Sequence, residues 1–292
     1  MNKHHVKYLL VGGGVASASA AEAIRSIDPE GSVLLIAQES TRPYHRPPLS
    51  KQALRERQPR SEFVTHPPGW FKSHGIELRT GRRVAHLDTA RQSVLLDDGQ
   101  EISYDKILLA TGASPRHLAI PGHNLPGLHY LRTVEDLERL LHAVDKAKSE
   151  GHRHTRRTSA DPASPPPRGR AVVIGSGLLA VELAASLTQV GLEIDLLLKN
   201  GHPWRKFAGE TTGKWVAKLL ENNGVQVRPG AAPVRLEGDG RVQRIVPPST
   251  EVIACDFAIA AVGVAANREL LRGTPIAAEK AILTDPHCRT NV

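Results

Sequence analysis

The sequence contains very little cysteine, which limits the chemistry it can perform. Its 292 residues include two cysteines, Cys255 and Cys288. Two cysteines cannot form a disulfide framework, and without a neighbouring ligand set they do not indicate a zinc site. No C-x-x-C or C-x-x-x-x-C pair is present, so dithiol redox chemistry is not expected. We predict that Cys255, which lies in an expected strand, is a packed apolar residue and that Cys288 is also structural.

Long hydrophobic runs are also absent. No stretch reaches the roughly 18 apolar residues that a membrane-spanning helix requires. The first residues lead directly into an expected strand, without the apolar core of a secretory signal. We therefore expect a cytoplasmic protein with no membrane partner.

Two further functional patterns are missing. Ser50 does not lie in a G-x-S-x-G turn, so hydrolase chemistry is not expected. The 14 histidines include no H-x-x-x-H pair on an expected helix. His152 and His154 lie close together, but in a stretch that is expected to be irregular. The sequence therefore predicts no metal site.

Negative charge is in deficit, and the formal net charge is +8. Much of the excess lies in the segment 149–170, which is rich in arginine and proline. Such a segment cannot bury apolar surface, so we predict a solvated, mobile loop over 149–170. A nucleic-acid-binding arm is the alternative, but no aromatic residues alternate with the arginines to form a stacking platform. Nucleic acid is therefore not the expected partner.

Two glycine-rich turns are the most informative feature that is present. Each follows a short apolar strand and opens a predicted helix, over Ala16–Ile27 and Leu178–Val190. In a dinucleotide turn the first glycine allows the tight strand-to-helix connection, the second lets the backbone approach a pyrophosphate, and the third position must be small. The phosphates then lie at the helix N-terminus, where free N–H groups point outward. The three positions are Gly12, Gly14 and Ser17 in the first turn, and Gly175, Gly177 and Ala180 in the second.

The internal similarity extends beyond the turns. The segment 102–112 matches the segment 253–263, and in both an aspartate precedes an apolar strand that ends in glycine at the same spacing. Repeated similarity of this kind indicates two related modules built from βαβ units. Two such modules suggest that the chain holds two nucleotide cofactors.

The predicted fold class is α/β, with two Rossmann-like modules that have parallel sheets, and a three-stranded antiparallel insertion. The first module spans 1–120, with an incomplete return segment over 264–292. The second spans 121–263 and includes the basic, proline-rich loop 149–170. A hairpin is expected over 84–96, and helices over 134–148 and 215–222. The expected parallel strands are Val6–Leu10, Val33–Ala37, Ile107–Ala110, Ala171–Ile174, Ile194–Leu198 and Val225–Arg228.

Five segments carry a family resemblance: GGGVAS at 12–17, RPPLSK at 46–51, ATGASPR at 110–116, GSGLLAVELA at 175–184 and AAVG at 260–263. Together they resemble the two-dinucleotide-binding, FAD- and NAD(P)-dependent pyridine nucleotide oxidoreductases. Within that family they are similar to the branch of ferredoxin and rubredoxin reductases and apoptosis-inducing factor. RPPLSK is the most branch-specific segment. The resemblance covers nearly the whole chain except the basic loop.

The resemblance implies FAD in the first module and NAD(P)H in the second. Glu182 falls on the family position that faces the flavin and pairs with the lysine of PLSK. It therefore implies catalytic roles for Lys51 and Glu182, and predicts an ion pair between them across the two modules. The alternative is that Glu182 is a solvated helix residue. The implied cofactor-binding residues are Gly12, Gly14, Ser17, Glu39, Arg46, Lys51, Val84, Ala110, Thr111, Gly112, Arg116, Gly175, Gly177, Leu178, Leu179, Lys199 and Gly263.

The acids that contact ribose depart from the family pattern. In the first module the family position is Gln38, and we expect the neighbouring Glu39 to take the ribose role, with Gln38 as a neutral substitute. In the second module the strand end reads Leu198-Lys199-Asn200, with no acid. The loss of an acid removes a bias against the 2′-phosphate of NADP. Lys199, Arg205 and Lys206 would suit that phosphate, or they are exposed cations without a ligand.

The C-terminal end is the third departure. The family continues into a Gly-Asp motif, whose aspartate holds the flavin side chain, and into a domain that covers the flavin. This sequence stops before both, so the resemblance implies a truncated chain that binds FAD weakly or not at all. A shortened gene product and a subunit that another chain completes both remain open.

The leading functional expectation is an FAD-dependent NAD(P)H oxidoreductase. It would pass a hydride from nicotinamide to flavin, and then electrons to an acceptor that needs no protein dithiol. The expected partner is a small acidic electron-transfer protein of the ferredoxin or rubredoxin type, or a small-molecule acceptor. A completing subunit or a homo-oligomer is compatible with the sequence. The alternative is a truncated, non-catalytic NAD(P)-binding protein that has lost stable FAD binding.

Overall fold

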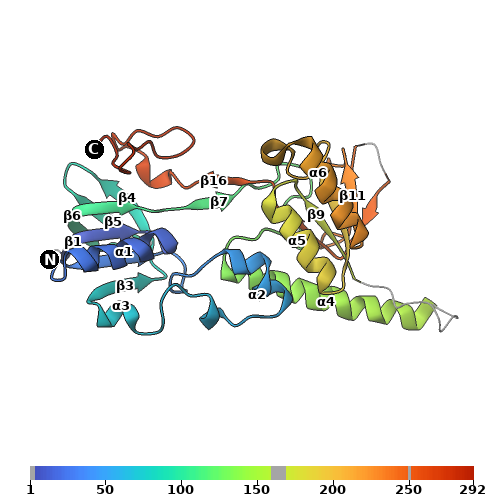
Figure 1. Ribbon diagram of the computed structural model, residues 1–292, viewed down its shortest axis with the longest axis horizontal. Coiled ribbons are helices and arrows are strands. Elements are labelled where there is room, and N and C mark those ends of the chain that lie inside the picture. Colours follow the sequence, from blue (N-terminus) through green and yellow to red (C-terminus); the bar gives the residue numbers. More distant parts are fainter. Residues whose placement is uncertain (1–3, 159–168, 249–250) are drawn as a thin grey trace. The chain divides into compact units, whose positions relative to one another are not determined.

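The chain forms two structural units, and each has its own sheet with a core of parallel strands (Figure 1). A computed structural model describes residues 4–158, 169–248 and 251–292. The first unit comprises residues 1–45, 59–114 and 265–292, and the second comprises 46–58 and 115–264. These units differ from the predicted modules, 1–120 and 121–263, chiefly because the segment 46–58 packs with the second unit.

The first unit contains a six-stranded sheet in the order β3-β2-β1-β6-β5-β4. The strands β3, β2, β1 and β6 are parallel, whereas β5 and β4 continue the sheet in antiparallel pairing. The predicted antiparallel insertion is therefore part of this sheet. The strands are β1 (His4–Val11), β2 (Val33–Ala37), β3 (Ile76–Thr80), β4 (Val84–Asp88), β5 (Ser93–Leu96) and β6 (Glu101–Leu109).

Alternation along the strands gives the first sheet two apolar faces. Leu9 and Val11 of β1 belong to a core cluster with Leu34 and Ile36 of β2. Leu10, which lies between them in sequence, points to the other face, because successive side chains of a strand alternate. On that second face Leu10 and its β2 neighbours pack against alanines of α1 (Val15–Ile27). Small alanines let this helix lie close to the sheet, which brings its N-terminus to the strand ends.

The second unit contains a five-stranded sheet in the order β11-β10-β9-β15-β8, and all of its strand pairs are parallel. Its first four strands match β3-β2-β1-β6 of the first unit in order and direction. The predicted α/β class with two related modules is confirmed. The strands are β8 (Leu128–His129), β9 (Arg170–Ile174), β10 (Glu193–Leu198), β11 (Val225–Pro229) and β15 (Phe257–Ala260).

The second unit also contains a separate three-stranded antiparallel sheet. Its order is β12-β13-β14, formed by Arg235–Glu237, Arg244–Val246 and Ile253–Ala254. Leu236 and Ile245 pair across it and join a core cluster with Val172 of β9. Two short strands, β7 (Ala113–Pro115) and β16 (Val264–Ala266), pair with each other where the chain passes between the units.

The helix α4 (Val134–Thr158) extends well beyond its expected end at Lys148. It begins at a capping box, in which the Thr133 hydroxyl accepts from the Asp136 N–H and the Asp136 carboxylate accepts from the Thr133 N–H. The prediction of a loop over residues 149–158 is wrong, because no proline interrupts the helix before Pro162. The remainder of the predicted loop, residues 159–168, lies outside the described residues.

The helix α6 (Arg205–Asn222) is also longer than predicted, because it begins ten residues before the expected start at Trp215. Non-helical backbone at Gly209 interrupts it. The helix α5 (Leu178–Gln189) follows the second glycine turn as predicted. The remaining short helices are η1 (Pro47–Ser50), α2 (Gln52–Arg55), η2 (Arg60–Glu62), α3 (Trp70–Ser73) and η3 (Glu269–Leu271). Within the described part of the chain, no helix combines the length and the apolar character needed to cross a bilayer.

Cys255 is buried in the core cluster of the second unit, as predicted. Burial raises the pKa of its thiol to about 12. The side chain is therefore a neutral thiol at physiological pH and behaves as an apolar residue. Cys288, in contrast, is exposed.

One buried carboxylate joins three strands of the second sheet. Asp195 of β10 is 1% exposed. Its Oδ2 accepts from Arg170 of β9 at 2.8 Å, and its Oδ1 accepts from Arg228 of β11 at 2.5 Å. A buried carboxylate is stable only when its oxygens are paired in this way. The interaction fixes the alignment of the three strands that support the second glycine turn.

We expect Asp195→Asn to destabilise the second unit by about 1–3 kcal/mol, because two charge-assisted hydrogen bonds are weakened in a buried setting. Urea unfolding of the variant and the wild type measures the difference. Asp239→Asn is the matched control, because the same substitution there changes an exposed carboxylate. Equal stability of the two variants would contradict a structural role for Asp195.

Candidate functional site

The first glycine turn joins β1 to α1. The Gly12 N–H donates to the carbonyl oxygen of Ile36 at 2.9 Å, and the Ala110 N–H donates to that of Val11 at the same distance. Gly12 has a φ of +127°, and a Cβ at this position would lie 2.1 Å from the Ala110 carbonyl oxygen. Only glycine fits both the backbone conformation and this close contact. The turn therefore lies directly against the end of β6.

The N-terminus of α1 is open in the way that a phosphate site requires. Gly14 caps the helix without a side-chain hydrogen bond, and no acid lies in the first turn. A Cβ at Gly14 would meet no atom within 4 Å, so the space beside this glycine is free. The Ser17 hydroxyl is buried and has no hydrogen-bond partner among the described residues. Free N–H groups and the positive end of the helix dipole fit the pyrophosphate of a dinucleotide. The small Ser17 is fully buried, so it suits the close approach of helix and strand at the third position of the turn.

Glu39 lies two residues beyond β2, at the strand end where the ribose acid was predicted. Its carboxylate accepts a hydrogen bond from the buried Tyr44 hydroxyl at 2.5 Å. The tyrosine fixes the orientation of the carboxylate. The ribose role of Glu39, or of the exposed neighbour Gln38, stays a prediction.

The segment 110–112, which follows β6, is hydrogen-bonded to Asn267 in the C-terminal part of the first unit. Thr111 Oγ1 donates to the Asn267 carbonyl oxygen at 2.8 Å, and Asn267 Nδ2 donates to the Thr111 carbonyl oxygen at 2.8 Å. The Asn267 N–H donates to the Gly112 carbonyl oxygen at 3.0 Å. Ala110, Thr111 and Gly112 are thereby held beside the first glycine turn. Val84, which was predicted to bind a cofactor, lies at the start of β4 and is buried in the core.

The second glycine turn repeats the first. The Gly175 N–H donates to the Leu197 carbonyl oxygen at 3.0 Å, and the Ala261 N–H donates to that of Ile174 at 2.8 Å. Gly175 has a φ of +144°, and its Cβ would lie 2.3 Å from the Ala261 carbonyl oxygen. The Ile174–Gly175 connection is thus pressed against the end of β15. The repeat that the sequence predicted therefore extends to individual hydrogen bonds.

The N-terminus of α5 is open in the same way. Gly177 caps it without a side-chain hydrogen bond, and its Cβ would meet nothing within 4 Å. Leu178 is exposed and Leu179 is partly exposed, so both lie at the surface next to the turn, while Ala180 is buried. The second turn therefore also fits a pyrophosphate.

Gly263 and Arg116, both predicted to bind a cofactor, contact each other in the second unit. The Arg116 N–H donates to the Gly263 carbonyl oxygen at 2.9 Å, and Arg116 Nε donates to the Val264 carbonyl oxygen at 3.0 Å. Arg116 is exposed. Lys199, the remaining predicted residue of this unit, is exposed directly after β10.

The predicted ion pair between Lys51 and Glu182 is present, with Nζ and Oε1 2.8 Å apart. Both residues belong to the second unit, so the expectation that the pair spans the two modules is wrong. The other carboxylate oxygen of Glu182 accepts from the Ser50 hydroxyl at 2.6 Å. One helical turn further along α5, the Ser186 hydroxyl donates to the Ser50 carbonyl oxygen at 2.7 Å. Because Glu182 and Ser186 share one helix face, α5 holds both the backbone and the side chains of the 46–58 segment.

Arg46, at the start of the same segment, donates to the carbonyl oxygen of Arg132 in the second unit. Sequence reasoning missed Ser50, Ser186 and Asn267 as site residues. Ser50 lies inside the RPPLSK segment and was considered only as a hydrolase nucleophile. Asn267 carries no signal of its own, since its role depends on the return of the chain from the other unit.

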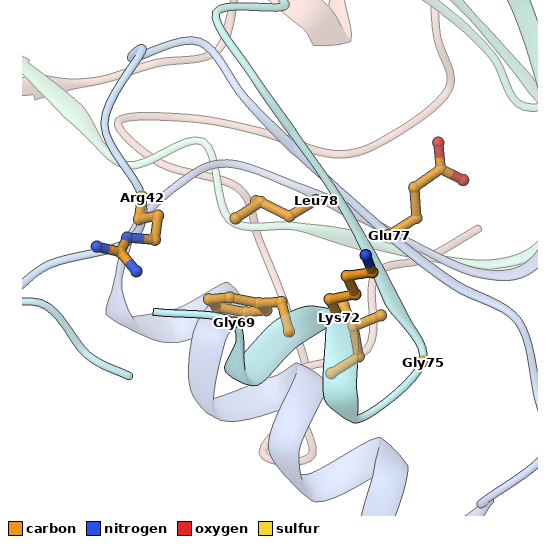
Figure 2. Close-up of a pocket in the computed structure, with 8 residues that line it drawn as sticks. Arg42, Gly69, Lys72, Gly75, Glu77 and Leu78 are labelled. Atoms are coloured by element: carbon orange, nitrogen blue, oxygen red, sulfur yellow. The ribbon is translucent and has the colours of Figure 1, made fainter. Parts of the chain in front are cut away.

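One hollow of the first unit lies apart from the predicted site residues. It has a volume of about 530 Å³ and lies between α3 and the edge strand β3, where Phe71 and Leu78 supply apolar surface. In Figure 2, Leu78 lies across from the α3 segment, with Arg42 at one end and Glu77 at the other. None of the residues predicted to bind a cofactor lines it.

The family is shown by a model that matches residues 6–292 and describes the pyridine nucleotide-disulphide oxidoreductases. The chain belongs to this family. It is 30% identical, over 94% of its length, to the ferredoxin–NAD(+) reductase component of a biphenyl dioxygenase system from Paraburkholderia xenovorans. It is 28% identical, over 97% of its length, to a rubredoxin–NAD(+) reductase from Pseudomonas putida. The predicted branch of ferredoxin and rubredoxin reductases is therefore confirmed.

A solved structure supports the same assignment. A chain in the covalent complex of putidaredoxin reductase with putidaredoxin matches 98% of this chain, with a TM-score of 0.85 and 26% identity. The match covers 65% of that chain. This chain likewise spans 62% of the biphenyl relative and 68% of the rubredoxin relative.

The two glycines of the second turn give a matched pair of substitutions. We expect Gly175→Ala to lower the free energy of unfolding by about 1–3 kcal/mol, since the methyl group meets a carbonyl oxygen and the backbone lies in a region disfavoured for alanine. Gly177→Ala is expected to change it by no more than about 0.5 kcal/mol, because its φ is −83° and the space is open. Urea denaturation measures both. Similar losses in the two variants would disprove the close contact with Ala261.

Proposed function

We propose that the protein is an FAD-dependent NAD(P)H oxidoreductase, in which a hydride passes from nicotinamide to flavin. The observation that carries the proposal is a structure that occurs once in each unit, the glycine turn with the helix N-terminus that follows it. We call it a dinucleotide cradle; the first cradle comprises residues 12–17 and the second comprises residues 175–180. In both units a strand-end carbonyl presses on the first glycine, and an uncapped helix N-terminus follows. Two cradles of the same construction suit two dinucleotides, and such a transfer needs two cofactors. Membership of the oxidoreductase family and the relatives' names support this assignment.

The residues of the first cradle fit FAD, and those of the second fit a nicotinamide dinucleotide. Bound FAD would accept a hydride and pass on its electrons one at a time. Gly12, Gly14 and Ser17 would hold its pyrophosphate, and Glu39 a ribose hydroxyl. Gly175 and Gly177 would do the same for the pyrophosphate of NAD(P)H. The protein's contribution is to position the two rings, which must come into contact when both cofactors are bound.

Lys51 and Glu182 are the proposed residues at the reacting rings. A lysine ammonium there stabilises negative charge on the flavin, provided that its position is fixed. Glu182 holds Lys51 at 2.8 Å, while Ser50 engages the second carboxylate oxygen and limits its rotation. Ser50 thus acts as a positioning residue for the pair.

The proposed electron acceptor is a small acidic iron–sulfur protein of the ferredoxin or rubredoxin type. The names of both relatives specify ferredoxin or rubredoxin, and the structural relative was solved with putidaredoxin. A net charge of +8 favours association with an acidic partner. An acceptor of this kind requires no dithiol in the reductase. Four other expectations remain predictions from the sequence. They are a small-molecule acceptor, a completing subunit, a homo-oligomer and a cytoplasmic location.

The function is tested by anaerobic titration of the purified chain with NADH or NADPH in the presence of excess FAD. We expect the visible flavin absorbance to bleach at a rate that increases with protein concentration. A rate equal to that of free FAD, together with normal binding of the nicotinamide nucleotide, would instead support an NAD(P)-binding protein without flavin chemistry.

The role of Glu182 is tested in the same assay. Glu182→Gln should slow flavin reduction by roughly tenfold or more, because loss of the carboxylate charge releases Lys51. Glu193→Gln, at an exposed position of β10, is the matched control and should have no effect. An unchanged rate in Glu182→Gln would remove the proposed role.

A further inference from the structure

The end of β10 carries a charge opposite to that expected for NADH binding. In dinucleotide-binding folds an acid at the end of the second strand accepts from the 2′-hydroxyl of NAD, whereas a nearby arginine accommodates the 2′-phosphate of NADP. Here β10 ends at Leu198, and the next residue is Lys199. The charge at this strand end is therefore positive. It lies in the turn that directly follows β10.

The turn after β10 is fastened to the second glycine turn. The Trp204 N–H donates to the carbonyl oxygen of Ser176, the central residue of that turn, at 2.8 Å. Trp204 has a φ of +59°, which is unfavourable for a tryptophan and is sustained by surrounding contacts. On the other side, a Cβ at Gly213 of α6 would lie 2.5 Å from the Pro203 carbonyl oxygen. The turn is therefore held between the nucleotide cradle and α6.

This fixed turn presents cations without acids. Residues 199–207 include Lys199, Arg205 and Lys206, and no aspartate or glutamate. Arg205 folds back over the turn, so that a Cβ at Gly201 would lie 3.6 Å from Arg205 Nη1. Among the described residues, the side chains of these three cations form no hydrogen bond or ion pair.

The first acid that follows this turn in sequence is Glu210, and it neutralises the charge only in part. Glu210 of α6 is bound by Lys214, with Nζ and Oε1 2.6 Å apart. The pKa of Glu210 is lowered chiefly by Lys214, and to a smaller extent by His202 and Arg205. Glu210 is therefore paired mainly with Lys214 and offsets the charge of Arg205 only in part, so net positive charge remains at the strand end.

We propose that the second cradle selects NADPH over NADH, with Lys199 and Arg205 binding the 2′-phosphate of the adenosine ribose. This inference rests on the proposed function and names the dinucleotide that the second cradle takes. It departs from the biphenyl and rubredoxin relatives, whose names specify NAD(+). Two cations on a fixed turn suit a phosphate dianion, whereas a ribose hydroxyl offers them only a neutral acceptor without an opposite charge.

The test uses adenosine 2′,5′-bisphosphate and adenosine 5′-monophosphate, which differ only in the 2′-phosphate and require no flavin. Isothermal titration of the full chain should show at least about tenfold tighter binding of the bisphosphate, a preference that decreases with added salt. Lys199→Gln and Arg205→Gln should each reduce the preference. Lys218→Gln is the control, because it removes an exposed lysine of α6 whose side chain has no partner in the described part of the chain, and it should leave the preference unchanged.

Lys199→Glu provides the opposite change, because it installs the acid that favours NADH. Titrations with NADPH and NADH should show that this variant prefers NADH, while the wild type prefers NADPH. Equal or tighter binding of the monophosphate and of NADH by the wild type would overturn the inference and leave the proposed function intact. Failure of all four nucleotides to bind would overturn the nicotinamide site itself, and the inference with it.

Discussion

A carbonyl oxygen pressed against a glycine holds each nucleotide turn in place. In the first unit the Ala110 carbonyl lies where a Gly12 side chain would be, and in the second unit the Ala261 carbonyl does the same at Gly175. In each unit the contact lies between the residue that follows one strand, β6 or β15, and the turn that leads from the adjacent strand into its helix. It leaves the helix N-terminus beyond the turn uncapped and open. The proposed binding of a pyrophosphate by each unit depends on this contact.

The two cradles share a backbone and differ in charge. The acid near the first cradle, Glu39, is oriented by Tyr44, whereas the corresponding strand end of the second cradle carries Lys199. The proposed choice of a different dinucleotide in each unit therefore depends on a few side chains after the second strand of each sheet. The Lys51–Glu182 pair adds a third element, since Ser50 and Ser186 bind it to the helix that opens at the second cradle. A change at this helix would affect both the cradle and the ion pair.

The sequence predicted the parts of the structure that depend on local rules. Glycine spacing located both turns, apolar runs located the parallel strands, and the family resemblance paired Lys51 with Glu182. Features that depend on distant parts of the chain were missed. Asn267 binds the segment at Thr111 although it lies far away in sequence. The segment 46–58 packs with the second unit because α5 supplies its partners, which no local pattern reveals. The basic composition of residues 149–158 predicted a loop, whereas α4 continues to Thr158 and the first proline of the segment is Pro162.

The central claim is that the chain contains two separate dinucleotide cradles of the same construction. Calorimetric titration with FAD and with NADPH, on the wild type and on Gly14→Ala and Gly177→Ala, tests it most directly, since both alanines fit the backbone and fill only the phosphate space. The account predicts one site for each nucleotide in the wild type, with FAD bound more weakly than NADPH. It also predicts that Gly14→Ala weakens FAD alone and that Gly177→Ala weakens NADPH alone. A single shared site, or loss of both nucleotides in either variant, would contradict it.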